Sequence, residues 1–306
     1  MKPIPTIPAS PVETGVGICS LMFNYILCKI GSFIVSRVPL RIAYKIAIFI
    51  SDLRYIFARE DRQATRENLK AIFPQKTEKE IRRIRMRMFR NFAKYLVDFF
   101  RLSKLDTECV KRNIKIENLH YIDEALAKGK GVIVLTAHIG NWELGAAIIS
   151  LLGYPLWIIA LPHRHKKEDI FFNSQRESKG VKIIPLGRAV RACLNLLKEN
   201  KVIALAGDRD FNELGAVVDF FGKPTYLPQG PAALALKTGA AIVPGFTFRN
   251  KDDSYTLRFE KPIEFTSTGD KNEDLKMLIN RCKNIIEGYI QKYPDQWFMF
   301  RRFWIQ

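Results

Sequence analysis

After residue 130 the chain alternates short apolar runs with helical segments. The apolar runs have the length of strands and lie at residues 132–136, 157–161, 181–185, 202–206, 241–247 and 255–259. Helical patterns occupy residues 142–152, 188–199 and 231–238, and glycines follow the first and the last of them. This alternation predicts an α/β fold with a mainly parallel central sheet flanked by helices. A length of 306 residues accommodates that domain and a smaller helical addition.

The N-terminal third has a different pattern. Residues 1–15 contain four prolines and are expected to form a flexible leader. Residues 16–38 are mostly apolar and just long enough to span a membrane, and basic residues lie at the end of this segment and directly after it, at Arg37, Arg41, Lys45 and Arg54. A helix lying in the membrane interface, or one buried against the protein, fits the same pattern. We therefore expect a membrane-associated helical region at residues 16–115 and the α/β domain at residues 116–306.

A second helix is predicted after Thr77. Thr77 and Glu80 have the spacing of a capping box, and apolar residues then recur every three or four positions up to residue 99. The opposite face of this helix is basic, with Arg82, Arg83, Arg85, Arg87 and Arg90. Such a face is either solvated or in contact with lipid phosphates.

The net charge of +18 indicates an anionic partner, either nucleic acid or anionic lipid. Residues 1–100 hold 18 Lys or Arg against 8 Asp or Glu, so 10 of these net charges lie in the third that is also the most apolar. This coincidence favours lipid. A nucleic-acid-binding module is the less favoured alternative, because the sequence has no recognisable recognition helix or aromatic and basic strand motif.

The segment Gly131-Val-Ile-Val-Leu-Thr-Ala-His138-Ile-Gly140-Asn141-Trp-Glu143 joins a predicted strand to a predicted helix. His138 should therefore lie at the carboxyl edge of the sheet, where open α/β sheets bind ligands. Glu143 is close enough in sequence to accept a hydrogen bond from one ring nitrogen, which leaves the other nitrogen as a general base. Backbone N–H groups near Gly140 and Asn141 are candidates to hold a carbonyl oxygen as it becomes negative.

Further polar residues follow other predicted strands. Asp208, Arg209 and Asp210 come after residues 202–206, so they should face the same edge as His138, either binding substrate or capping the loop. Arg209 is a candidate to bind a phosphate or a thioester carbonyl. Residues 163–167 form a basic segment around Arg164 that either binds substrate or is solvated, and Arg176 and Arg188 are weaker substrate-binding candidates. His163 and His165 lack a suitably spaced third ligand, so no metal is expected.

The spacing His138-x-x-x-x-Glu143 after a buried strand resembles the motif of the glycerolipid acyltransferase superfamily. The sequence His138-Ile-Gly-Asn-Trp-Glu143 is similar to that of its lipid A biosynthesis (lauroyl/myristoyl) branch. Residues 66–74 (Arg-Glu-Asn-Leu-Lys-Ala-Ile-Phe-Pro) resemble an upstream family element. Residues 207–210, 220–224 and 230–235 resemble the second family block, and residues 294–304 resemble the aromatic and basic ending.

Two departures concern the acceptor. Lipid A enzymes usually have Asp-Gln-Asp where this chain has Asp208-Arg209-Asp210, and their ending commonly carries Trp-x-Trp-x-x-His where this chain has Trp297-Phe-Met-Phe-Arg301. Both changes look more like the phosphatidylinositol mannoside acyltransferase branch.

The resemblance implies an O-acyltransferase. Its donor would be an acyl thioester, on acyl carrier protein or coenzyme A, and it would use no cofactor, no metal and no covalent acyl-enzyme. Its acceptor would be a hydroxyl of an anionic glycolipid: first a lipid A precursor, alternatively a phosphatidylinositol mannoside or another lipid. The expected location is the cytoplasmic face of the inner membrane, and no nucleic-acid partner is expected.

Overall fold

The computed structural model describes residues 18–162, 166–185, 187, 189–210 and 215–305. Within them the strands are β1 (Ile114–Glu117), β2 (Val132–Thr136), β3 (Leu156–Ala160), β4 (Lys182–Pro185), β5 (Val202–Ala206), β6 (Ala216–Phe220), β7 (Lys223–Leu227), β8 (Ala241–Arg249) and β9 (Tyr255–Phe259). The α-helices are α1 (Ile18–Arg37), α2 (Leu40–Phe57), α3 (Arg59–Ile72), α4 (Glu78–Phe100), α5 (Thr107–Asn113), α6 (His120–Leu126), α7 (Trp142–Leu151), α8 (Lys166–Glu177), α9 (Ala189–Lys198), α10 (Gly230–Thr238) and α11 (Lys271–Lys292). The described residues also form two 3₁₀-helices, η2 (Leu102–Lys104) and η4 (Pro294–Gln296).

The central sheet has the strand order β1-β9-β8-β2-β5-β3-β4 within the described residues. All neighbouring strands run parallel except β8 and β9, which form an antiparallel pair. The predicted mainly parallel α/β fold is therefore confirmed. The register between β2 and β5 places Thr136 opposite Ala206, so the residues that follow these two strands emerge side by side.

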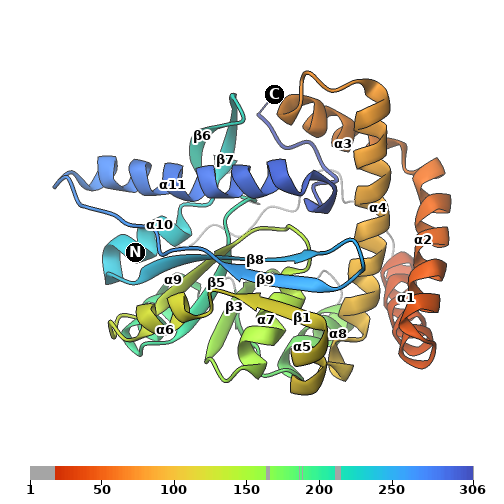
Figure 1. The fold of residues 1–306 in the computed structure, drawn as a ribbon, viewed down its shortest axis with the longest axis horizontal. Coiled ribbons are helices and arrows are strands. Elements are labelled where there is room, and N and C mark those ends of the chain that lie inside the picture. The colour runs from red at the N-terminus through yellow and green to blue at the C-terminus, as the bar shows by residue number, and fades with distance from the viewer. Residues whose placement is uncertain (1–17, 163–165, 186, 188, 211–214, 306) are drawn as a thin grey trace.

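Helices cover both faces of the sheet (Figure 1). Successive side chains of β2 point to opposite faces. Val132 and Val134 pack with the apolar residues of α6 and α7, whereas Ile133 and Leu135 pack with those of α9, α10 and α11. Because both faces of β2 are buried, its sequence is continuously apolar rather than alternating.

Helix α4 runs along one end of the sheet, and α2 and α1 pack on its outer side (Figure 1). The predicted capping box is confirmed: the Thr77 hydroxyl accepts from the backbone N–H of Glu80 at 3.3 Å, and the Glu80 carboxylate accepts from the backbone N–H of Thr77 at 2.8 Å. The buried face of α4 includes Ile81, Ile84 and Met88, at the predicted spacing.

The basic face of α4 is only partly exposed. Arg82, Arg83 and Arg87 are exposed, and Arg85 and Arg90 are half-buried. Arg87 binds Asp295 at 2.9 Å, Arg90 binds Asp52 at 2.7 Å, and Arg85 donates to the hydroxyl of Tyr55 at 2.8 Å. Three of the five arginines thus bind other parts of the chain. The sequence had indicated only a solvated face or contact with lipid phosphates.

The segment expected at residues 16–38 is helical from Ile18 to Arg37. Among helices formed by described residues, none is long and apolar enough to cross a membrane. The leader at residues 1–15 lies outside the described residues. Strand β1 spans the expected domain boundary between residues 115 and 116.

Several elements had no counterpart in the sequence prediction. The hairpin β6–β7 forms a separate two-stranded sheet, and α8 begins at Lys166 within the segment expected to be a basic loop. Helix α8 is mainly polar, and Phe171 is its one fully buried residue, so it shows little apolar periodicity.

Candidate active site

His138 lies in the turn between β2 and α7. Strand β2 ends at Thr136, and α7 begins at Trp142 with Asn141 as N-cap; the Asn141 side chain accepts from the backbone N–H of Leu144 at 3.0 Å. Gly140 has φ of 63° between them, and a Cβ there would lie 2.0 Å from the carbonyl oxygen of Thr247. The turn therefore requires glycine, for its backbone conformation and for the close approach of β8.

The imidazole of His138 is paired with Asp208. Its Nδ1 lies 2.8 Å from Oδ1 of Asp208, and its backbone N–H lies 3.1 Å from both carboxylate oxygens. Asp208 is fully buried, and Oδ2 also accepts from the indole N–H of Trp297 at 3.0 Å. Burial alone would raise the pKa of Asp208, but the charge and hydrogen bond of His138, with Arg209 and Trp297, lower it from 3.8 to about 2.

This geometry sets the tautomer of His138. Asp208 is a carboxylate near neutral pH and can only accept, so Nδ1 carries the proton. The side chain of His138 remains 18% exposed, and no partner for Nε2 occurs among the described residues. Nε2 is therefore the nitrogen with a free lone pair, as a general base requires.

The expected contact between Glu143 and His138 is replaced by another ion pair. Both oxygens of Glu143 accept from the guanidinium of Arg176, at 2.9 Å from Nε and 2.7 Å from Nη2. The pair is buried, with side-chain exposures of 6% for Glu143 and 12% for Arg176. Glu143 therefore joins α7 to α8, and Arg176, expected to bind substrate, is occupied by Glu143.

The backbone N–H groups expected to hold an oxyanion are occupied as well. Gly140 donates to the carbonyl oxygen of Gln296 and Asn141 to that of Thr247, each at 2.8 Å. The Asn141 amide nitrogen donates to the hydroxyl of Tyr255 at 3.3 Å. These groups hold the turn in place and are not available to a substrate in this structure.

Arg209 lies next to Asp208, and not all of its hydrogen-bond donors are satisfied within the described part of the chain. One terminal nitrogen donates to the carbonyl oxygen of Phe298, and its buried Nε has no hydrogen-bond partner among the described residues. Burial and the neighbouring Arg301 lower the pKa of the guanidinium, whereas Asp208 raises it. An arginine in this state is a cation with an unsatisfied buried donor, suited to an anionic or polarised oxygen.

Within its described residues, the structure does not place the other predicted substrate-binding residues in contact with His138. Asp210 accepts from the backbone N–H of Gly215, as the loop-capping alternative proposed. Arg164 and Arg188 lie outside the described residues. The part of the chain that the structure describes holds no cluster of three or more potential metal ligands.

The C-terminal segment supplies residues that the sequence analysis did not assign to the site. Trp297 is fully buried and fixes Asp208, the backbone N–H of Phe298 donates to the carbonyl oxygen of His138 at 3.1 Å, and Gln296 accepts from Gly140. A ring of Trp142 also contacts the His138 ring, with centroids 4.9 Å apart. The aromatic ending was visible in the sequence, but its contact with the turn was not.

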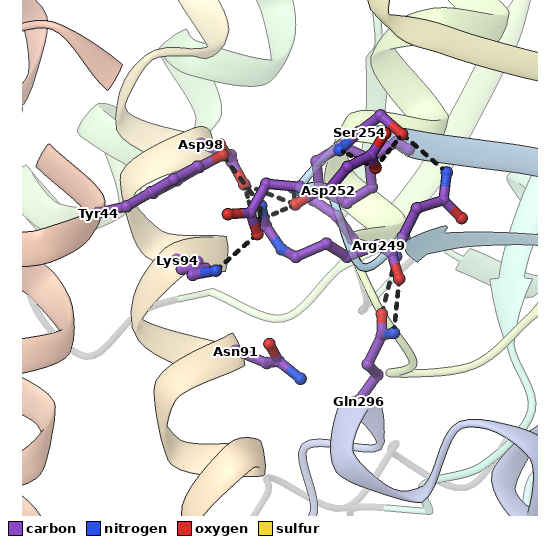
Figure 2. A network of polar contacts seen from close by, with 12 residues as sticks. Tyr44, Asn91, Lys94, Asp98, Arg249, Asp252, Ser254 and Gln296 are labelled. Carbon is purple, nitrogen blue, oxygen red and sulfur yellow. Dashed lines mark hydrogen bonds and ion pairs between the residues drawn. The ribbon is translucent and has the colours of Figure 1, made fainter. Parts of the chain in front are cut away.

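A buried polar network supports this turn from the side of α2 and α4 (Figure 2). The Tyr44 hydroxyl donates to Asp98 at 2.5 Å, and Asp98 also accepts from Arg249 and, at 2.5 Å, from Tyr255. Gln296 pairs with both backbone groups of Arg249, at 2.8 and 2.9 Å. Burial and Asp98 raise the pKa of Tyr44, so its hydroxyl stays a donor.

Comparison with known proteins identifies relatives over most of the chain. The family model of the bacterial lipid A biosynthesis acyltransferases matches residues 19–306. A phosphatidylinositol mannoside acyltransferase of Mycolicibacterium smegmatis is 31% identical over 222 residues, covering 70% of each chain. A lipid A biosynthesis acyltransferase of Haemophilus influenzae is 22% identical over 269 residues, covering 87% of this chain and 81% of the relative.

Among solved structures, a 1-acyl-sn-glycerophosphate acyltransferase from Thermotoga maritima aligns with a TM-score of 0.35 and 12% identity, over 86% of this chain and 97% of that chain. The match of the family model, which covers the turn, the Asp208 segment and the C-terminal ending together, decides the assignment. The chain belongs to the bacterial lipid A biosynthesis acyltransferase family and is an enzyme that transfers acyl groups.

Proposed function

We propose that this enzyme transfers a fatty acyl group from a thioester to a hydroxyl of an anionic glycolipid, with His138 as the general base. The observation that supports the proposal is the pairing of His138 Nδ1 with the buried Asp208, which leaves Nε2 to accept a proton on a side chain that is 18% exposed. In this proposal Asp208, and not Glu143, orients the imidazole and stabilises its protonated form.

The proposed reaction is a direct transfer. His138 Nε2 takes the hydroxyl proton as the acceptor oxygen attacks the thioester carbonyl, and a C–O bond forms. The tetrahedral intermediate then collapses, the C–S bond breaks, and the imidazolium returns the proton to the departing thiolate. Arg209, with its unsatisfied Nε, is the proposed donor to the oxyanion, since the amides of Gly140 and Asn141 are occupied.

The acceptor that we propose is a glycosylated phospholipid, ahead of the lipid A precursor that the motif resemblance put first. Two observations support this order. The mannoside acyltransferase relative is 31% identical, against 22% for the lipid A relative from Haemophilus influenzae and 24% for a palmitoleoyltransferase from Escherichia coli. The Asp208-Arg209-Asp210 sequence also departs from the usual lipid A pattern in the same direction.

We further propose that α1 and α2 bind the surface of the inner membrane from its cytoplasmic face. Most of the exposed large apolar side chains of the described residues lie on these two helices; Phe49 is 71% and Phe57 77% exposed. Arg41 and Lys45 are exposed on α2 beside them. An apolar face bordered by cations is the pattern of a helix that lies in an anionic interface.

The test is a transfer assay with purified enzyme, acyl carrier protein and coenzyme A thioesters, and both classes of acceptor in mixed vesicles. We expect His138→Ala to reduce turnover by about 10³-fold or more. The matched control is His120→Ala, because His120 is exposed at the start of α6. Lipid mass spectrometry of a deletion strain identifies the acceptor by the missing acyl chain. Normal turnover by His138→Ala, or an acyl group trapped covalently on the enzyme, would contradict the mechanism.

A further inference from the structure

A groove on the described part of the chain does not include His138 in its lining. It has a volume of about 920 Å³ and lies between the N-terminal end of α2, the segment from η2 to β1, and the hairpin that joins β8 to β9. This volume is at the upper end of the range for ligand-binding pockets. The groove adjoins the first turn of α7, where Leu144 lines it and Tyr255 contacts the N-cap residue Asn141.

The basic side chains of the groove are largely without carboxylate partners. Arg101 and Lys104 donate only to carbonyl oxygens at the end of α1, and Arg112 donates to the carbonyl oxygen of Glu108 at 3.4 Å. Arg41 is exposed and has no partner among the described residues. Carbonyl groups satisfy hydrogen bonds but do not cancel a full charge, so these four residues keep the groove positive.

The acidic side chains of the groove are mostly neutralised. Asp98 is paired with Arg249, and Asp253 with Lys94 at 2.6 Å, as parts of the network in Figure 2. Asp252 accepts from Ser254 and has no basic partner among the described residues. Four cations without carboxylates thus face a single uncompensated carboxylate.

The groove is also amphipathic and continuous with the exposed apolar face. Leu102, Leu105 and Ile114 contribute apolar lining. Leu40 lines the groove, and it is 39% exposed at the start of α2, which carries more of the exposed large apolar residues than any other described helix. A ligand that bears a phosphate and an apolar chain fits such a lining, and a free anion would leave the apolar part unused.

We propose that this groove binds the phosphate-bearing headgroup of an anionic membrane lipid, at a site separate from the centre at His138. The inference rests on the proposed membrane association of α1 and α2. It does not depend on which lipid accepts the acyl group. A lipid held here by its phosphate would fix α2 and the first turn of α7 relative to the membrane.

The first test measures binding of the full chain to phosphatidylcholine vesicles with and without phosphatidylglycerol. Arg41→Gln combined with Arg112→Gln should weaken binding to the anionic vesicles about tenfold or more, because each basic residue near an anionic membrane surface adds to the binding affinity. Arg82→Gln with Arg83→Gln is the matched control. It removes two exposed charges from α4, and residue 82 lies 16 positions, or roughly 24 Å of helix, from Asp98 at the groove.

A second variant distinguishes binding of a lipid inside the groove from general electrostatic attraction between the basic surface and the membrane. Asn113 is exposed in the lining, so Asn113→Trp should fill part of the groove without changing the charge or the core. We expect Asn113→Trp to weaken anionic vesicle binding while its melting temperature stays near that of the parent. We also expect a photoreactive phosphatidylglycerol to label residues 101–115 in the parent and not in this variant.

Three results would overturn the proposal. The first is that the double arginine variant and Asn113→Trp both bind anionic vesicles as tightly as the parent does. The second is that the photoreactive lipid labels only the apolar faces of α1 and α2. The third is that inorganic phosphate binds at the groove while the protein shows no preference for anionic vesicles. Binding and labelling need no turnover. Loss of acyl transfer in the parent would therefore count against the proposed function alone, and a failed binding test would count against the groove alone.

Discussion

Replacing Asp208 by asparagine tests the pairing on which the proposed mechanism depends. The carboxylate accepts from His138 Nδ1 at 2.8 Å, from the His138 backbone N–H and from the Trp297 indole at 3.0 Å. An amide has only one acceptor oxygen. If its nitrogen faces Nδ1, the imidazole proton must move to Nε2, which can then no longer act as base. If its nitrogen faces Trp297, the amide N–H and the indole N–H are both donors, and the hydrogen bond between them is lost.

The size of the effect follows from these contacts. In a Ser-His-Asp triad the same substitution gives the wrong tautomer and lowers turnover about 10⁴-fold. We therefore expect kcat to fall about 10³- to 10⁴-fold, which is about 4 to 5.5 kcal/mol of activation free energy. The pKa of Asp208 is lowered from 3.8 to about 2 in the folded protein, so the ionised carboxylate also stabilises the fold by roughly 2 kcal/mol near neutral pH. Turnover must therefore be measured well below the melting temperature of the variant.

Glu143→Gln is the matched comparison, since it also converts a buried carboxylate into an amide beside the turn. Breaking its ion pair with Arg176 should lower the free energy of unfolding by about 3 kcal/mol. The folded fraction should keep kcat within about tenfold of the parent, because Glu143 does not contact the imidazole. Steady-state kinetics and thermal melting of both variants give the answer. An active Asp208→Asn together with an inactive but stable Glu143→Gln would refute the assignment and restore Glu143 as the orienting residue.

Four further outcomes are expected. Gly140→Ala should destabilise the protein by about 2 kcal/mol or more, because φ is 63° and the new Cβ would meet Thr247; a parental melting temperature would contradict this. Since the pKa of Asp208 is lower in the folded chain, its contribution is complete above about pH 4 and is lost as pH falls toward 2, so acid melting curves of the parent and Asp208→Asn should converge there. Arg209→Lys should keep the fold but reduce kcat/KM about tenfold or more, since an ammonium cannot reproduce the directed Nε donor; full activity would exclude Arg209 from the oxyanion role. Tyr44→Phe should lower the melting temperature by several degrees, whereas Tyr154→Phe, which removes a Tyr to Asp bond of 2.7 Å at the surface, should change it little; equal effects would show that the buried bond stabilises the protein no more than the surface bond does.

The sequence determined the parts of this protein that local patterns control. Continuous apolar runs located β2 and β5 at their observed bounds, because a strand buried on both faces has few polar residues along its length. The bounds of β9 were also predicted, although Thr256 and Arg258 interrupt its apolar residues. Thr77 and Glu80 located the start of α4, because both partners of a capping box lie within one turn. The same reasoning placed His138 and Asp208 at the carboxyl edge of the sheet.

The tertiary structure alone decided which carboxylate serves His138. Each of His138 and Asp208 lies two residues beyond a strand end, and the register of Thr136 with Ala206 brings them together across 70 positions of sequence. Glu143 is nearer in sequence, but α8 places Arg176 against it. Trp297 completes the site from 89 residues beyond Asp208. Proximity in sequence identifies only the groups that can meet, whereas strand register and helix packing, which depend on burial of the whole core, determine which of them do.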